Sequence, residues 1–194
     1  MANTELFNIL QNVTNAKRVF RDQGAEEILR RPDLLCPLVD AVHEHDAELA
    51  VRAAWILERV CVTEIRLIIP YVKDFANGIE TLKDERILRP ASKICSLLSR
   101  EYMKEPWEEF DPESDWINAV VSVSFEWLTG PHNVATQVFA MDTLHQWGTR
   151  FDWIHGELLS ILDREYAKSS SGYRSRARKI MDKILLSGGM KKQN

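Results

Sequence analysis

Histidines and clustered carboxylates are the residues of this 194-residue chain whose types could support chemistry. His43 and His45 are two positions apart, and such residues on a helix point about 200° away from each other, so one metal ion could not take both. His132, His145 and His155 have no cysteine or second histidine at ligand spacing. The chain also lacks a Gly-rich phosphate loop and a nucleophile elbow. We therefore expect neither a metal nor a cofactor.

Carboxylate pairs suitable for acid–base catalysis occur in the segment Glu108-Glu109-Phe110-Asp111. They belong to an acidic stretch, residues 103–115, whose two prolines interrupt the helical pattern. Nothing there indicates the desolvation that catalytic carboxylates need, which favours a solvated insertion loop. A second interpretation stays open, in which Trp107, Phe110 and their acidic neighbours dock on a basic surface of this molecule or of a partner.

A stripe of arginine and tryptophan is the most promising binding feature. On a helix through residues 50–60, Arg52, Trp55 and Arg59 share one side, and small or apolar residues take the other. Arginine and tryptophan are enriched at binding hot spots, and guanidinium groups hold carboxylates or phosphates bidentately. The stripe predicts a face for an acidic or extended partner segment. Alternatively, Arg52 pairs with a carboxylate in a ladder between repeats, and Trp55 packs on the adjacent helix.

The helix that carries this stripe belongs to an internal repeat. The segment Val51–Leu57 recurs 37 residues earlier, and then 37, 87 and 124 residues later, with copies at residues 14–20, 88–94, 138–144 and 175–181. The third position is alanine in four of the five copies and proline in the other, and the seventh is always large and apolar. A small residue lets two helices approach each other, and the large one fills the space a turn later.

An amphipathic stretch precedes each copy and is expected to be the first helix of a hairpin. These stretches are residues 4–10, 34–43, 64–75, 116–128 and 153–166. Asp46 is a predicted N-cap, and Asn77-Gly78 has the composition of a turn. The predicted fold is all-α, an α-solenoid of about five helical hairpins. It forms one domain over residues 1–187, with the insertion loop near 103–115 and a disordered tail at 188–194.

In such a stack the second helices line the concave surface, which would carry the equivalent stripe from every copy. The predicted partner-binding residues are Asn15, Arg18 and Asp22, then Arg52, Trp55 and Arg59, then Arg89, Ser92 and Ser96, then Phe139, Asp142 and Gln146, and finally Arg176, Lys179 and Lys183. Three tryptophans in the first helices, Trp116, Trp127 and Trp153, are at spacings typical of core packing.

The motif His45-Asp46-x-x-x-x-Val51-Arg52-x-Ala54 resembles the signature of HEAT/armadillo repeats. This resemblance extends over nearly the whole chain and implies a protein-binding scaffold. The segments 52–61, 89–95 and 152–155 are similar to a family of small bacterial helical proteins of uncharacterised function, some of which are labelled adenylosuccinate lyase. That label implies a lyase as one alternative function. Such lyases have a Ser-rich loop ending in Met-Pro-x-Lys-x-Asn, and the cluster Ser169–Ser171 is not followed by that pattern.

HEAT-like DNA glycosylases suggest another alternative, with Trp55, Phe139, Asp142 and Trp147 around a damaged duplex. The charge distribution argues against nucleic acid. From Arg164 onward, nine Lys and Arg residues outnumber two acidic ones, so that this segment has a net charge of +7. The other 163 residues then carry −11 of the overall −4, whereas a DNA groove needs strong positive charge.

The compartment expected from the sequence is the cytoplasm. No apolar run approaches the roughly 20 residues of a membrane span, and the N-terminus lacks the features of a signal peptide. Cys36, Cys61 and Cys95 are odd in number and lie in apolar stretches, which favours reduced thiols in the core.

Overall fold

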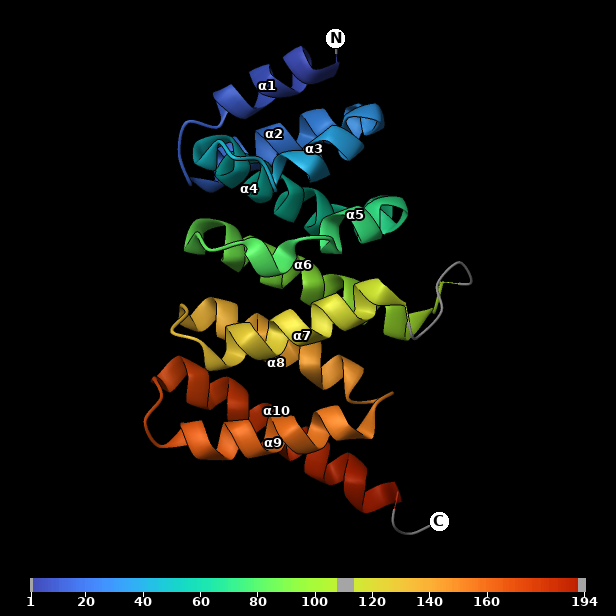
Figure 1. The fold of residues 1–194 in the computed structure, drawn as a ribbon, viewed down its shortest axis with the longest axis vertical. Helices are drawn as coiled ribbons and strands as arrows, with labels where there is room; N and C mark the ends of the chain where they lie inside the picture. Colours follow the sequence, from blue (N-terminus) through green and yellow to red (C-terminus); the bar gives the residue numbers. More distant parts are fainter. Residues whose placement is uncertain (1, 108–113, 192–194) are drawn as a thin grey trace.

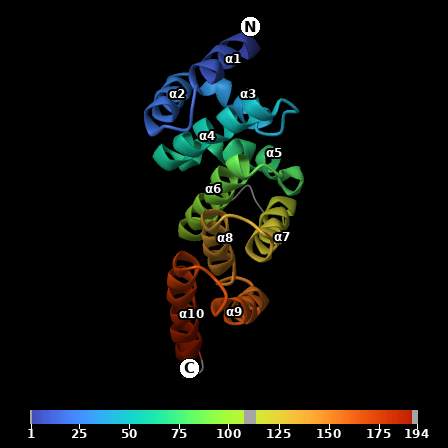
Figure 2. The same ribbon diagram turned by 90° about the vertical axis from the view of Figure 1, so that its left-hand side faces the viewer.

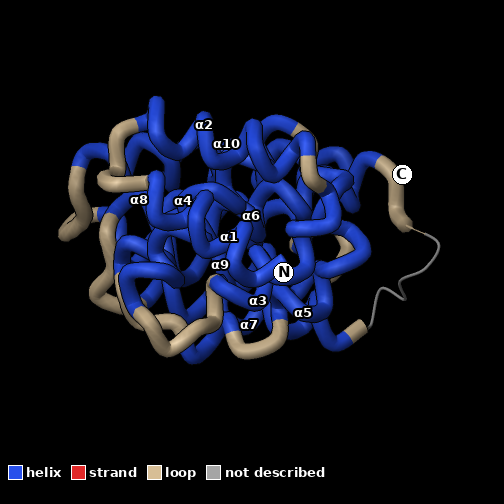
Figure 3. Tube along the Cα trace, turned by 90° about the horizontal axis from the view of Figure 1, so that it is seen from above, coloured by secondary structure: helices blue, strands red, loops and turns tan. Residues whose placement is uncertain are grey.

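The structure, a computed structural model, describes residues 2–107 and 114–191. Within these residues the chain forms ten α-helices and three short 3₁₀-helices, without a strand (Figure 3). The α-helices are α1 (Ala2–Asn12), α2 (Arg18–Arg30), α3 (Leu35–Ala41), α4 (Ala47–Thr63), α5 (Val72–Ala76), α6 (Glu85–Lys104), α7 (Asp115–Thr129), α8 (Val134–Trp147), α9 (Asp152–Tyr166) and α10 (Ser171–Lys191). The 3₁₀-helices are η1 (Pro32–Leu34), η2 (Ile65–Tyr71) and η3 (Ile79–Thr81). The all-α prediction is confirmed. Of the expected terminal tail, residues 192–194 lie outside the described residues, and α10 runs up to Lys191.

The helices are arranged in two layers along the long axis of the molecule (Figure 1). The even-numbered helices follow one another on one side, and the odd-numbered helices on the other (Figure 2). Helix α2 contacts α4, α4 contacts α6, α6 contacts α8, and α8 contacts α10. We call α2, α4, α6, α8 and α10 the even-helix layer. The hydrophobic core contains buried residues from all ten α-helices, so both layers contribute to it.

Local signals place the helix ends. Asp46 caps α4 as predicted, since its carboxylate accepts hydrogen bonds from the backbone N–H groups of Glu48 and Leu49 at 3.0 and 3.2 Å. The side chain of Asp84 caps α6 in the same way. Gly78 has φ of +83°, the left-handed conformation expected of a glycine in the Asn77-Gly78 turn.

The small and large positions of the repeat pack as expected in the later copies. Ala53 and Leu57 of α4 are fully buried, as are Ala140 and Leu144 of α8. The third position of the last copy, Ala177 of α10, is also fully buried. These residues allow neighbouring even-numbered helices to approach closely.

The predicted placement of the first copy is wrong. Residues 14–17 precede α2, and Ala16 is exposed instead of packed. Gly24 takes the close-approach position in α2, where a Cβ atom would lie 2.7 Å from Cδ1 of the buried Ile56. The contact between α2 and α4 is thus so close that glycine occupies the position held by alanine elsewhere.

The tryptophans of the odd-numbered helices do not all enter the core. Trp116 and Trp127 are buried, as predicted. The prediction is wrong for Trp153, whose exposure is 62%. Its indole stacks on Phe125 of α7 at a centroid distance of 5.9 Å, so it packs on the outside of the neighbouring helix.

The cysteines are free, and two of them are buried as expected, Cys61 in α4 and Cys95 in α6. Burial raises the pKa of the Cys95 thiol to about 12 and also raises that of Cys61. Cys36 in α3 is exposed, which corrects its predicted core position. Over the described residues, no helix combines the length and apolar character needed to cross a membrane.

Candidate interaction face

The predicted stripe of α4 is the side of that helix which reaches solvent. Arg52, Trp55 and Arg59 are half-buried, and the residues between them are buried. The helical periodicity of residues 50–60 therefore predicted the solvent-facing side of α4 correctly. It lies in the even-helix layer, between α2 and α6 (Figure 2).

Glu58 of α4 is the centre of an ion-pair network that joins three helices. Its carboxylate is only 2% exposed. Oε1 lies 2.7 Å from Nζ of Lys93 in α6. Oε2 lies 3.5 Å from Nη1 of Arg89 in α6 and 3.6 Å from Nη1 of Arg21 in α2. A buried carboxylate needs such partners, because an unpaired buried charge is strongly destabilising.

A second carboxylate, Asp22 of α2, is the centre of a neighbouring pair of contacts. It accepts hydrogen bonds from Nε of Arg59 in α4 and from Nε of Arg18, one turn earlier in α2. Burial tends to raise the pKa of Asp22, but the hydrogen bonds from Arg59 and Arg18 outweigh it and hold that pKa below its usual value. Asp22 is thus a carboxylate that remains ionised between two arginines.

These contacts form a ladder of ion pairs between successive helices, which was the alternative to a free binding stripe. The ladder includes Arg59 and Arg89, whereas Arg52 donates to the amide oxygen of Gln11 in α1 at 3.2 Å. Arg52 is therefore hydrogen-bonded to a neutral group, and its positive charge is not neutralised there.

The cations in this region still outnumber the carboxylates. We define the cationic cluster as Arg18, Arg21, Arg52, Arg59, Arg89 and Lys93, together with Asp22 and Glu58. Six cations and two carboxylates give it a net charge of +4. Sequence reasoning included Asp22 but missed Arg21, Lys93 and Glu58, the carboxylate that these two cations contact. The spacing of Arg86, Arg89, Lys93 and Arg100 by multiples near one helical turn was the signal that could have found Lys93.

The two layers also differ in net charge, and the even-helix layer, which contains the cationic cluster, is the positive one. The five even-numbered helices contain sixteen Lys and Arg residues and nine Asp and Glu residues, a net charge of +7. The five odd-numbered helices, with η1 and η2, contain three basic and ten acidic residues, a net charge of −7. The connecting segments and chain ends, together with η3 and its Glu80, account for the remaining −4. The two layers therefore differ in electrostatic character.

Trp55 has a specific task inside the fold. Its Nε1–H donates to the backbone carbonyl of Arg86 in α6 at 3.1 Å. Pro90, four residues after Arg86, lies inside α6 and has no N–H with which to bond that carbonyl. The indole thus supplies the hydrogen bond that the proline removes, and only the ring of Trp55 is left to contact a partner.

Two predicted members of the α6 stripe are wrong. Ser92 and Ser96 are buried, at 0% and 3% exposure. The side of α6 that reaches solvent carries Lys93 and Leu97 instead. The prediction assumed that the same repeat positions reach solvent in α6 as in α4. After Arg89, the positions of α6 that reach solvent are instead one residue later in the sequence, at Lys93 and Leu97.

The predicted residues of α8 and α10 form a smaller contact of their own. Asp142 of α8 is mostly buried and forms an ion pair with Arg176 of α10. Phe139 of α8 is half-buried, and Lys179 of α10 is exposed. Helix α8 contains neither lysine nor arginine, so the basic character of the layer is interrupted between α6 and α10.

The described part of the insertion loop is packed onto the protein. Trp107 stacks on Trp116 of α7 at a centroid distance of 5.7 Å and meets Tyr102 of α6 edge-on at 5.4 Å. It is therefore anchored in an aromatic cluster of its own chain. Phe110 lies outside the described residues.

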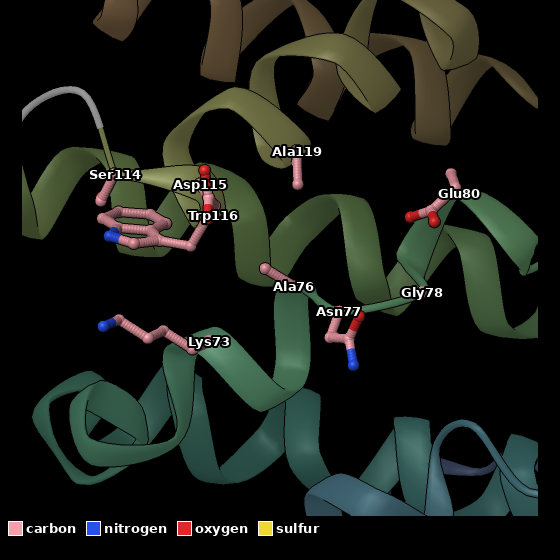
Figure 4. Close-up of a pocket in the computed structure, with 9 residues that line it drawn as sticks. All are labelled: Lys73, Ala76, Asn77, Gly78, Glu80, Ser114, Asp115, Trp116 and Ala119. Carbon is pink, nitrogen blue, oxygen red and sulfur yellow. The ribbon is translucent and has the colours of Figure 1, made fainter.

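A pocket of about 530 Å³ lies between α5, η3 and the start of α7 (Figure 4). Lys73 lies on one wall and Trp116 on the opposite one, and Asp115 and Glu80 add carboxylates. Among the described residues, its lining contains no histidine or cysteine. Ser114, the first described residue of the insertion loop after Trp107, also lines the pocket.

Two histidines lie against each other where α8 meets α9. His145 of α8 stacks on His155 of α9 at a centroid distance of 5.4 Å, and Nε2 of His155 is 3.0 Å from the backbone oxygen of His145. Burial, followed by electrostatic interactions with His155 and Lys183, lowers the pKa of His145 to about 4. Among the residues with described side chains, no group of three His, Cys, Asp or Glu residues could hold a metal ion.

Comparison with known proteins adds no assignment to this geometry. No family model matches the chain, and neither a curated protein nor a solved structure matches it.

Proposed function

We propose that this chain is a HEAT-like α-solenoid of about five hairpins that acts as a non-enzymatic protein-interaction module. Its partner is a protein or peptide with an acidic, extended segment, which lies along the even-helix layer. That layer would be the concave side of the solenoid. The observation that carries the proposal is the cationic cluster, where six cations surround two carboxylates on a face that reaches solvent.

The exposure of the individual cations supports a role in binding. The side chains of Arg18 and Arg89 are 75% and 44% exposed, so both can contact a partner and still keep their internal partner. Arg52 has a neutral partner, and its charge is available to a carboxylate. Bidentate pairing between guanidinium and carboxylate is strong and directional, which would give such a groove its selectivity.

The same contacts weigh against the glycosylase alternative. Asp142 is engaged by Arg176, and Trp147 is buried with its Nε1–H donating to Ser99 Oγ at 2.8 Å. A glycosylase needs an available carboxylate and accessible aromatic rings at the damaged base. Both residues are instead part of the packing of α8.

The test is partner capture by charge-reversed variants. Arg18→Glu combined with Arg52→Glu removes the exposed Arg18 and the half-buried Arg52 from the cluster and leaves the network around Glu58 intact. The matched control, Arg30→Glu with Lys168→Glu, changes the net charge equally and lies outside the cluster. Captured proteins would be identified by mass spectrometry, and circular dichroism would check folding.

We expect the cluster variant to lose an acidic partner that both the wild type and the control retain. Equal capture by both variants would end the proposal. Salt-dependent binding of duplex DNA that the cluster variant loses, or turnover of adenylosuccinate, would favour one of the rival functions instead.

A further inference from the structure

We infer that the cationic cluster contains a seat for a dianionic tetrahedral oxyanion, above Glu58 and between α2 and α6. The ligand chemistry is the phosphoryl group, either as free phosphate or as a phosphorylated side chain of the partner. The inference deepens the proposed function and rests on it only in placing the partner on this face.

The charges around Glu58 are unequal. Arg21, Arg89 and Lys93 approach this single carboxylate, so two positive charges remain without a counter-ion. Asp22 next to Arg21 does not remove this excess, because it already pairs with Arg18 and Arg59. A dianion would neutralise the excess at Glu58, whereas a carboxylate side chain would leave one uncompensated charge.

The contact distances indicate that donors are still available. Only the Lys93 contact, at 2.7 Å, has the length of a strong charged hydrogen bond. The guanidinium groups of Arg21 and Arg89 stand 3.6 and 3.5 Å from the same oxygen, Glu58 Oε2. Nε of Arg21 is buried and has no hydrogen-bond partner within the described residues. Each guanidinium has five N–H donors, so most of the donors of these two arginines are unused by Glu58.

The arrangement matches the ligand in position as well as in charge. Arg21 and Arg89 come from opposite sides of α4 and converge on one oxygen, so their guanidinium groups lie close to each other. The side chains of Arg21 and Arg89 are 17% and 44% exposed, so both side chains reach solvent. A phosphoryl group has three oxygens and can therefore bridge two arginines and a third cation.

The first experiment is a titration with inorganic phosphate at pH 7.5 and constant ionic strength, followed by calorimetry and thermal denaturation. We expect saturable binding with a dissociation constant of about 1 mM, the range accessible to so small a ligand. Sodium acetate, a monoanion, should give no saturable signal. The variant Arg21→Gln with Arg89→Gln should bind phosphate at least about tenfold more weakly. Arg30→Gln, an arginine of α2 outside the cluster, should bind like the wild type.

A second variant keeps the test valid if loss of two arginines impairs folding. Glu58→Gln removes the internal counter-ion and preserves the size of the side chain. It should bind phosphate about threefold to tenfold more tightly than the wild type, because three cations then face the ligand alone. Weaker or unchanged binding by Glu58→Gln would overturn the inference, and so would equal signals for acetate and phosphate.

The source of the phosphoryl group is distinguished by a peptide pair, acetyl-Gly-Gly-Ser-Gly-Gly-amide with and without phosphate on serine. Tighter binding of the phosphopeptide than of inorganic phosphate identifies a phosphorylated chain as the ligand, and the reverse order identifies free phosphate. If phosphate fails to bind while Arg18→Glu with Arg52→Glu still loses its acidic partner, the proposed function stands without this seat. If phosphate binds and no partner is captured, the seat stands without the proposed function.

Discussion

The hydrogen bond between Trp55 and the carbonyl of Arg86 should depend on Pro90. Trp55→Phe keeps an aromatic ring in place and removes only the donor and part of the apolar surface. Because Pro90 cannot supply an N–H, the carbonyl loses its partner inside the protein in this variant. In Pro90→Ala the restored N–H can bond the same carbonyl, and the loss of the indole N–H should then matter less.

The magnitude follows from the contact. A hydrogen bond of 3.1 Å between an indole and a carbonyl contributes about 1 kcal/mol net, and Trp55→Phe should cost about 1–2 kcal/mol once the lost apolar contacts are included. In the Pro90→Ala background we expect that cost to fall by about 1 kcal/mol. The coupling energy of the double-mutant cycle is therefore about 1 kcal/mol, above the roughly 0.3–0.5 kcal/mol within which independent sites are additive.

The assay is urea denaturation of the four proteins of the cycle. Trp147→Phe is the matched control, because its Nε1–H donates to Ser99 and should not couple to Pro90. Additive effects of Trp55→Phe and Pro90→Ala would refute the reasoning, and Trp55 would then be a candidate hot spot without a structural role.

Two further predictions concern the contact between α8 and α9. A Cβ atom on Gly148 would lie 1.9 Å from Cδ2 of His155, so Gly148→Ala should displace that ring. We expect the free energy of unfolding, measured by urea denaturation, to fall by roughly 1–3 kcal/mol. A change within experimental error would contradict this packing. The pKa of His145 in the folded state is about 4, below the ordinary value near 6.5. As the pH falls, the unfolded chain therefore binds this proton before the folded protein does. The contribution of the neutral ring to stability is present above pH 6.5 and is lost as the pH falls toward 4. Allowing for solvent screening of this partly exposed ring, wild type should lose about 1–2 kcal/mol more than His145→Gln between pH 7 and pH 4, and parallel losses in the two proteins would show that another group is responsible.

The later repeats were predictable because their small and large residues follow the period of a helix. Ala53 with Leu57, and Ala140 with Leu144, are recognisable from type and spacing alone. The first copy was not, because the close contact of α2 with Ile56 places glycine where the pattern has alanine. The alanine that fits the pattern, Ala16, therefore lies in the segment before α2 and not in the helix.

The candidate site was predictable only one helix at a time. Helical periodicity identified the solvent-facing side of α4, because the apolar residues of a helix sequence show which of its faces is buried. The partners on that face depend on which neighbouring helix lies beside it. The convergence of Arg21 and Lys93 on Glu58 comes from residues 35 to 37 positions away from the carboxylate, and no local pattern encodes such a contact.

The two buried cysteines, Cys61 in α4 and Cys95 in α6, can be used to measure the local opening of these helices. Thiolate, the form that alkylating reagents attack, is scarce at Cys95, whose pKa is raised to about 12, and at Cys61, where burial acts in the same direction. The exposed Cys36 can react in the native protein and serves as an internal reference. The labelling rate at Cys61 therefore follows the excursions of α4 into open states, and the rate at Cys95 follows those of α6, so that one reagent can rank the local stability of the helices that carry the cationic cluster.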